Sequence, residues 1–122
     1  MKVLICGSRD WINKDLIKET LTEVISEVEE EITVIHGAAR GADKIGGEVA
    51  AEMKLKVEEY PADWNTHGRY AGFVRNKFMV EECKPNVILA FWDGKSKGTL
   101  HTIKLAKKNN ILNLIVKDSN GK

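Results

Sequence analysis

Apolar residues fall into five short segments that predict five β-strands. Val3 to Cys6 and Val87 to Phe91 contain no polar position, which is typical of strands buried on both faces of a parallel sheet. Ile32 to Ile35 and Ile111 to Val116 predict two further strands. Leu55 to Tyr60 alternates apolar and charged residues, which favours a strand at the edge of the sheet.

A helical period between these segments predicts four helices. The first begins near Asn13, a residue type favoured as N-cap. Ile12 and Ile17 on either side of that cap are placed to form a hydrophobic staple. The apolar stripe of this helix follows the period of 3.6 residues and consists of Leu16, Ile17, Leu21, Val24, Ile25 and Val28.

The second predicted helix covers about 42–54 and contains Gly46 and Gly47. Because glycine lowers helix propensity, we expect this helix to pack closely on the sheet or on a ligand. The last helix is predicted from about Gly98 to Lys108, where two asparagines close it.

A proline ends the third strand, so residues 61–68 are predicted to form a loop. The third helix is predicted over 69–83, with Ala71, Val74 and Phe78 on successive turns of its inner face. A Lys-Pro-Asn sequence then breaks the helix before the fourth strand.

The alternation of strands and helices predicts the α/β class, as a single Rossmann-like three-layer domain with a five-stranded parallel sheet in the order 3-2-1-4-5. The domain is expected over 1–117, followed by a polar tail over 118–122 that we expect to fray. The winding reverses between strands one and four, and ligands bind at the carboxyl ends of strands beside such a point. Three turns should therefore open onto one cleft, at 7–9, 36–43 and 93–99.

The composition of the chain argues against some classes of binding partner. Apolar residues make up 43% and charged residues 30% of the chain, and the formal net charge is +1, which argues against a nucleic-acid-coating protein. No segment has the pattern of a membrane span or a signal peptide. Cys6 and Cys83 lack metal-type spacing and are expected to be reduced thiols of a cytoplasmic protein.

The three turns concentrate the chemistry of anion binding. Gly98 and Thr99 at a helix start are expected to hold a phosphate through backbone N–H and hydroxyl groups, or to form a plain helix cap. Arg9 and Arg75 suit bidentate phosphate binding, or surface ion pairs. The predicted ligand-binding residues are Gly7, Ser8, Arg9, Trp11, His36, Gly37, Gly41, Asp43, Trp64, Arg75, Asn76, Asp93, Gly94, Ser96, Gly98 and Thr99.

Three carboxylates are the catalytic candidates: Asp43, Asp63 and Asp93. Each could act as an acid, a base or a metal ligand. Asp43 could instead accept ribose hydroxyls or cap its helix. The sequence requires no cofactor and predicts no metal site, but it does not decide whether a divalent metal takes part.

Several other residues allow two interpretations. His36 ends a buried strand, where a structural histidine is the more common outcome. Arg40 is as well explained by a solvated loop arginine. The three tryptophans, Trp11, Trp64 and Trp92, follow strands one, three and four. They could stack on a base or cap the open end of the core.

Five motifs follow one another along the chain: Gly-Ser-Arg at 7–9 with Trp11, His-Gly-x-x-x-Gly-Ala-Asp at 36–43, Tyr-Pro-Ala-Asp-Trp at 60–64, Ala-Gly-x-x-Arg-Asn at 71–76 and Gly-x-Ser-x-Gly-Thr at 94–99. Together they resemble the SLOG superfamily, and within it the small YspA-type (cpYpsA-related) proteins. The resemblance implies a Rossmann-like fold and a nucleotide-derived ligand, such as an ADP-ribose-like, NAD-like or nucleoside-phosphate-like molecule. Members of the superfamily are often homo-oligomers, so the resemblance also implies a homo-oligomer.

The superfamily includes the lonely guy phosphoribohydrolases, which carry Pro-Gly-Gly-x-Gly-Thr-x-x-Glu after the fourth strand. Gly94 and 98–99 match this motif. The catalytic glutamate falls at Thr102, or at His101 if the register slips by one, and neither residue supplies a carboxylate. The arginine on the preceding helix of those enzymes matches Arg75. The resemblance therefore implies phosphate binding more than hydrolysis.

Three functions follow as hypotheses. The first is a binding module for a nucleotide-derived small molecule that acts as a sensor, carrier or sequestering protein. The second is an enzyme that hydrolyses an N-glycosidic or phosphoester bond of a nucleotide. The third, single-stranded DNA binding as in the SLOG protein DprA, is disfavoured by the near-neutral charge and rests on the fold alone.

Overall fold

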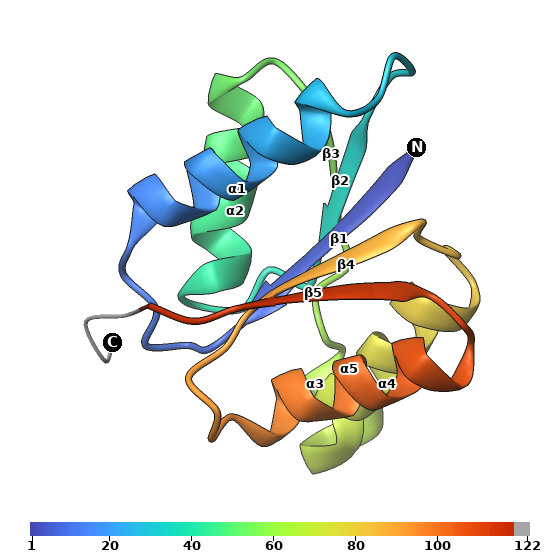
Figure 1. Ribbon diagram of the computed structural model, residues 1–122. Helices are drawn as coiled ribbons and strands as arrows, with labels where there is room; N and C mark the ends of the chain where they lie inside the picture. Colours follow the sequence, from blue (N-terminus) through green and yellow to red (C-terminus); the bar gives the residue numbers. More distant parts are fainter. Residues whose placement is uncertain (119–122) are drawn as a thin grey trace.

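The computed structural model describes residues 1–118 as one α/β domain (Figure 1). Its strands and helices alternate along the chain in the predicted way. The elements are β1 (Lys2–Gly7), α1 (Lys14–Ser26), β2 (Thr33–His36), α2 (Ala42–Glu52), β3 (Lys56–Glu59), α3 (Trp64–His67), the 3-10 turn η1 (Gly68–Tyr70), α4 (Ala71–Glu81), β4 (Val87–Phe91), α5 (Lys97–Lys108) and β5 (Leu112–Val116).

The five strands form a parallel sheet in the order β3-β2-β1-β4-β5, which confirms the predicted topology. In the centre, Val3 of β1 pairs with Val34 of β2 on one side and with Val87 of β4 on the other. Helices α1 and α2 cover one face of the sheet, and α3, α4 and α5 lie on the other (Figure 1). The carboxyl ends of the strands therefore meet at one edge, with a helix layer on each side.

Each face of the sheet has its own apolar core. Under α1 and α2 the core includes Val3, Ile5 and Trp11, and under α4 and α5 it includes Leu4 and Ile88. These side chains are at most 2% exposed, and burying an aliphatic side chain of this size contributes about 1.5–3 kcal/mol. Strands β1 and β4 contribute to both cores, which explains their uninterrupted apolar sequence.

Helix α2 packs so closely on the sheet that a Cβ at either of two positions would force neighbouring atoms to shift. A Cβ at Gly46 would lie 2.7 Å from Ile5 Cγ2, and one at Gly47 would lie 2.5 Å from His36 Nε2. The close packing that we expected is therefore against the sheet, on the face away from α4 and α5.

The segment after β3 differs from the prediction. Residues 64–67 form the short helix α3 within the expected loop, because the Asp63 carboxylate caps it by accepting from the Thr66 N–H at 3.1 Å. In α4, Ala71 is buried as predicted, but Val74 and Phe78 are more than 40% exposed. The predicted inner face was wrong there, and the buried face consists of Ala71, Asn76, Met79 and Val80.

Other element ends differ by small amounts. Asn13 caps α1 by accepting from the Leu16 N–H, as predicted, but the hydrophobic staple is absent because Ile12 is 70% exposed. Asp118 accepts a hydrogen bond from Asn13 at 3.0 Å. The rest of the predicted tail, 119–122, lies outside the described residues. None of the described helices has the length and apolar character that crossing a membrane requires.

Candidate functional site

The turns after β1, β2 and β4 meet at the carboxyl edge of the sheet and enclose an inner chamber of about 70 Å³. A larger outer pocket of about 340 Å³ adjoins it, and the two share Arg9, Ala39 and Arg75. We call the two together the cleft. The chamber is lined by Cys6, Gly7, Arg9, Ala39, Asp43, Arg75, Asn76, Met79, Ser96, Gly98, Thr99 and Thr102.

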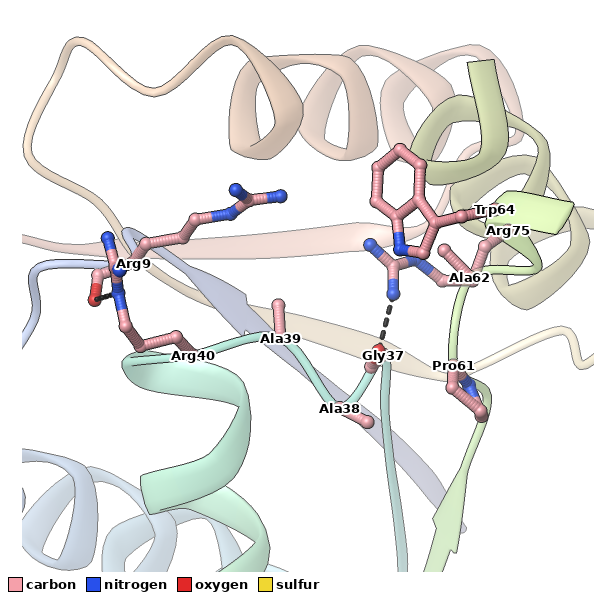
Figure 2. A pocket seen from close by; sticks show the side chains of 9 residues that line it. All are labelled: Arg9, Gly37, Ala38, Ala39, Arg40, Pro61, Ala62, Trp64 and Arg75. Carbon is pink, nitrogen blue, oxygen red and sulfur yellow. Dashed lines mark hydrogen bonds between the residues drawn. The ribbon is translucent and has the colours of Figure 1, made fainter. Parts of the chain in front are cut away.

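The outer pocket has an arginine-rich lining without a carboxylate among the described residues: Arg9, Gly37, Ala38, Ala39, Arg40, Pro61, Ala62, Trp64 and Arg75. Figure 2 shows the Arg9 side chain reaching across the pocket toward Trp64 and Arg75. The Arg40 guanidinium turns away, since it donates to the Arg9 carbonyl at 3.3 Å and lies 3.4 Å from the Asp10 carboxylate. The indole of Trp64 is half exposed.

Arg75 is fixed by bonds at two of its nitrogens. Its Nη1 donates to the Gly37 carbonyl (Figure 2), and its Nε donates to Asn76 Oδ1 at 2.8 Å. A Cβ at Gly37 would collide with the guanidinium, so a larger residue there would displace Arg75 from this position. Burial lowers the pKa of Arg75, against the opposing effect of Asp43. Asn76 Nδ2 in turn donates to the Gly98 carbonyl at 3.3 Å, which ties Arg75 to the start of α5.

Asp43 lies at the inner end of the cleft and is 5% exposed. Its Oδ2 accepts from the backbone N–H of Gly37 at 3.1 Å and of Ala39 at 3.3 Å. Burial raises its pKa to about 6, although Arg75, the two backbone donors and Arg9 act in the opposite direction. Asp43 therefore shapes the 37–39 turn, and it titrates close to neutral pH.

The start of α5 keeps part of its predicted anion-binding character. Ser96 Oγ caps the helix by accepting from the Thr99 N–H at 3.4 Å and from the Thr99 hydroxyl at 3.0 Å, so the helix-cap alternative applies to those two groups. The N–H groups of Lys97 and Gly98, in the first turn, have no intrahelical acceptor. Gly98 lines the chamber, and a Cβ there would meet no atom within 4 Å.

Close contacts between neighbouring loops explain the residue types at three further predicted site positions. Ser8 is buried, and its Oγ accepts from the Asp93 N–H at 2.9 Å. A Cβ at Gly7 would collide with the Phe91 carbonyl, and one at Gly41 with the Ser8 carbonyl. Gly41 also has a φ of 82°, in the region that favours glycine. Ser8 and Gly41 make contacts between neighbouring loops and do not line the cleft.

Trp11 and His36 do not face the cleft. Trp11 is 2% exposed, packs 5.5 Å from the Phe91 ring and donates to the Asn13 carbonyl. Its expected stacking on a ligand was therefore wrong, and the core-capping alternative holds. His36 lies under α2 against Gly47, on the face of the sheet opposite Arg75. It lines a separate groove and not the cleft, and the alternative of a structural histidine fits this position.

The other two carboxylates lie outside the cleft. Asp63 caps α3 and lines a neighbouring pocket. Asp93 is exposed, and its Oδ1 accepts from the N–H groups of Lys95 and Ser96, which lower its pKa. Gly94, in the same turn, has a φ of 84° and also lies outside the cleft. Within residues 1–118, no cluster of three or more His, Cys, Asp or Glu residues is arranged to hold a metal ion.

Sequence reasoning missed several lining residues, among them Ala39, Pro61 and Met79. They line the cleft through small or apolar surfaces that have no chemical signature in a sequence. Thr102 also lines the chamber and donates to the Gly98 carbonyl at 3.4 Å. The resemblance to the lonely guy motif places the catalytic glutamate at Thr102, or at His101 if the register slips by one, and neither residue supplies a carboxylate. Burial raises the pKa of Cys6, which keeps its thiol neutral.

Comparison with known proteins identifies the family to which the chain belongs. A family model described as YspA, cpYpsA-related SLOG family matches residues 1–67. The chain belongs to the YspA, cpYpsA-related SLOG family. The match spans the turns after β1 and β2 and reaches past Trp64. The chain is also 37% identical over 115 residues to the Gene 61 protein of Mycobacterium phage D29, which covers 90% of this chain and 91% of that protein. Family membership therefore confirms the resemblance and directs attention to nucleotide-related ligands.

Proposed function

We propose that the protein binds a nucleotide-derived small molecule in the cleft, as a sensor, carrier or sequestering protein. The single observation that carries this proposal is the outer pocket itself. Arginines line it, it has no carboxylate among the described residues, and an exposed indole stands beside Arg75. Guanidinium groups bind phosphate oxygens through charge-assisted hydrogen bonds, and an indole stacks on a nucleobase.

In this proposal the phosphates lie between Arg9 and Arg75, and the base lies against Trp64. Arg75 is held in place by Gly37 and Asn76, so little ordering of its side chain is needed on binding. The backbone at Gly98 supplies further N–H donors at the inner end. A pocket of about 340 Å³ lies within the usual size range of small-ligand sites.

Titration calorimetry with AMP, NAD and ADP-ribose tests the proposal. Arg9→Ala is expected to weaken binding by roughly 10- to 100-fold, because one charge-assisted contact is worth about 1.5–3 kcal/mol. Arg40→Ala is the matched control: it removes the same charge from the rim, but its guanidinium already bonds to Asp10 and the Arg9 carbonyl. If both variants weaken binding equally, the effect comes from net charge and not from a specific contact of Arg9. If none of the three compounds binds, the proposal is refuted.

Hydrolysis of the bound nucleotide is the second candidate. One observation favours it, namely that Asp43 lines the chamber with a pKa raised to about 6, a value suited to proton transfer near neutral pH. Release of free base or ribose phosphate during the titrations, abolished in Asp43→Asn, would support it. Binding without product supports the binding module.

A further inference from the structure

His36 is buried and outside the cleft, but one of its ring nitrogens organises the turn that forms the cleft. The side chain is 2% exposed. Its Nδ1 accepts a hydrogen bond from the Ala38 N–H at 2.9 Å. Because Nδ1 is an acceptor, the neutral ring carries its proton on Nε2.

The bond to Ala38 stabilises a strained backbone. Ala38 has a φ of 59°, a left-handed conformation that residues with a Cβ rarely adopt. On either side of it, the N–H groups of Gly37 and Ala39 donate to Asp43, and the Gly37 carbonyl accepts from Arg75. The orientation of the Asp43 and Arg75 side chains therefore depends on the turn that His36 holds.

The opposite nitrogen of the ring lacks a hydrogen-bond partner. Nε2 is buried, and no partner for it occurs among the described residues. The Glu59 carboxylate, on β3, lies 3.6 Å away on a largely exposed side chain. Gly47 of α2 covers the ring, and Lys44 and Glu48 of the same helix line the groove beside it. The ring therefore lies between the Ala38 amide, which binds Nδ1, and the Glu59 carboxylate, which lies near Nε2.

The geometry points to His36 as a proton-sensitive positioning residue for the cleft: its neutral ring holds the 37–39 turn, and its protonation releases the turn and weakens phosphate binding. A proton on Nδ1 would face the Ala38 N–H, donor against donor, so that bond is lost. Nε2–H of the charged ring would gain a charge-assisted bond to Glu59. This inference rests on the proposed function of the cleft.

The charges around the ring set the pH range of the switch. Burial lowers the pKa of His36 below its ordinary value of 6.5, and Arg75 of α4 and Lys44 of α2 act in the same direction. Glu59 of β3 opposes them. The ring is therefore neutral at neutral pH, and release is expected below the usual range of histidine.

Two substitutions separate the hydrogen bond from the titration. His36→Asn places an amide oxygen where Nδ1 lies, so it can still accept from Ala38 but does not titrate. His36→Leu removes the acceptor at every pH. Binding of ADP-ribose is measured from about pH 7.5 to about pH 5, and each affinity is divided by that of His36→Asn, so that the titration of Asp43 cancels.

The wild-type affinity is expected to match that of His36→Asn at neutral pH and to fall about tenfold below it in acid, the equivalent of one hydrogen bond. His36→Leu is expected to bind about tenfold more weakly throughout. A wild-type ratio that stays constant with pH would overturn the inference, as would unchanged binding in His36→Leu.

A readout without ligand tests the same inference on the wild-type protein, so it does not depend on the folding of any variant. In NMR spectra of the free protein, the Ala38 amide signal is expected to titrate together with the His36 ring nitrogens. An Ala38 amide that does not follow the ring would overturn the inference. If no ligand binds at any pH, the proposed function fails, and the Ala38 titration still decides the role of His36.

Discussion

At the scale of single residues, the cleft depends on one buried carboxylate among cations. Asp43 is surrounded by Arg75, Arg9 and two backbone donors, and still its pKa is raised to about 6 because burial outweighs all of them. Its charged form is therefore less favourable in the folded state than in the unfolded chain. An anionic ligand near Arg9 and Arg75 would oppose that charge further, so binding of a pyrophosphate is expected to favour protonated Asp43.

Asp43 also makes stability depend on pH. Its folded pKa lies above the ordinary value of 3.8, so the folded state binds the proton more tightly, and this group's contribution falls as pH rises from about 4 to about 6. The whole change amounts to about 3 kcal/mol. Asp43→Asn does not titrate at this position. As the pH rises from about 4 to about 7, the unfolding free energy of this variant is therefore expected to increase relative to that of the wild type, by up to about 3 kcal/mol.

Denaturant unfolding of both proteins at a series of pH values measures this difference. Groups that titrate in both proteins, His36 among them, cancel in the comparison. A constant difference across the range would show that Asp43 has an ordinary pKa in the folded protein.

At the scale of elements, the strands could be predicted from sequence and the faces of some helices could not. The apolar runs Val3–Cys6 and Val87–Phe91 identify the central strands because only a doubly covered sheet buries such runs. Helix α4 has apolar residues around most of its circumference, with Phe73, Val74 and Phe78 exposed. Its period therefore does not define one inner face, and Asn76 is buried by its bonds to Arg75 and Gly98.

The same limit explains why the position of His36 could not be predicted. Its side chain lies on the same face of β2 as Val34, because side chains alternate along a strand. Both faces of this sheet are buried, so alternation assigns His36 to one helix layer without saying which. The contact between Gly47 and His36 settles the question, and no local pattern in the sequence contains it. The place of Arg9 and Arg75 in the cleft, in contrast, could be predicted from chemistry and strand order together.

An added methyl group is expected to have opposite effects on stability at Gly47, which packs against the sheet, and at Gly98, which does not. Gly47→Ala would press a Cβ against the His36 ring, which is expected to lower the unfolding free energy by about 1–3 kcal/mol. Gly98→Ala, in the first turn of α5 with no atom in reach, is expected to leave it unchanged or raise it by up to about 1 kcal/mol. Denaturant midpoints of the two variants measure this, and equal midpoints would contradict the close packing of α2 on the sheet.

At the scale of the whole molecule, three loops far apart in sequence form one cleft because the winding of the sheet reverses between β1 and β4. Helix α2 supports the 37–39 turn through Asp43, and α4 supplies Arg75 from the other side of the sheet. The family match covers 1–67, whereas Arg75 and the start of α5 come from the second half of the chain. The account therefore requires both halves to act on one ligand.

An NMR titration of the labelled protein with ADP-ribose tests that requirement most directly. The account predicts saturable shifts of backbone amides in both halves, at residues 7–9, 37–40, 62–64 and 97–99, and little change in α1 or β5. Saturable shifts confined to one half of the chain, or centred outside the cleft, would contradict it.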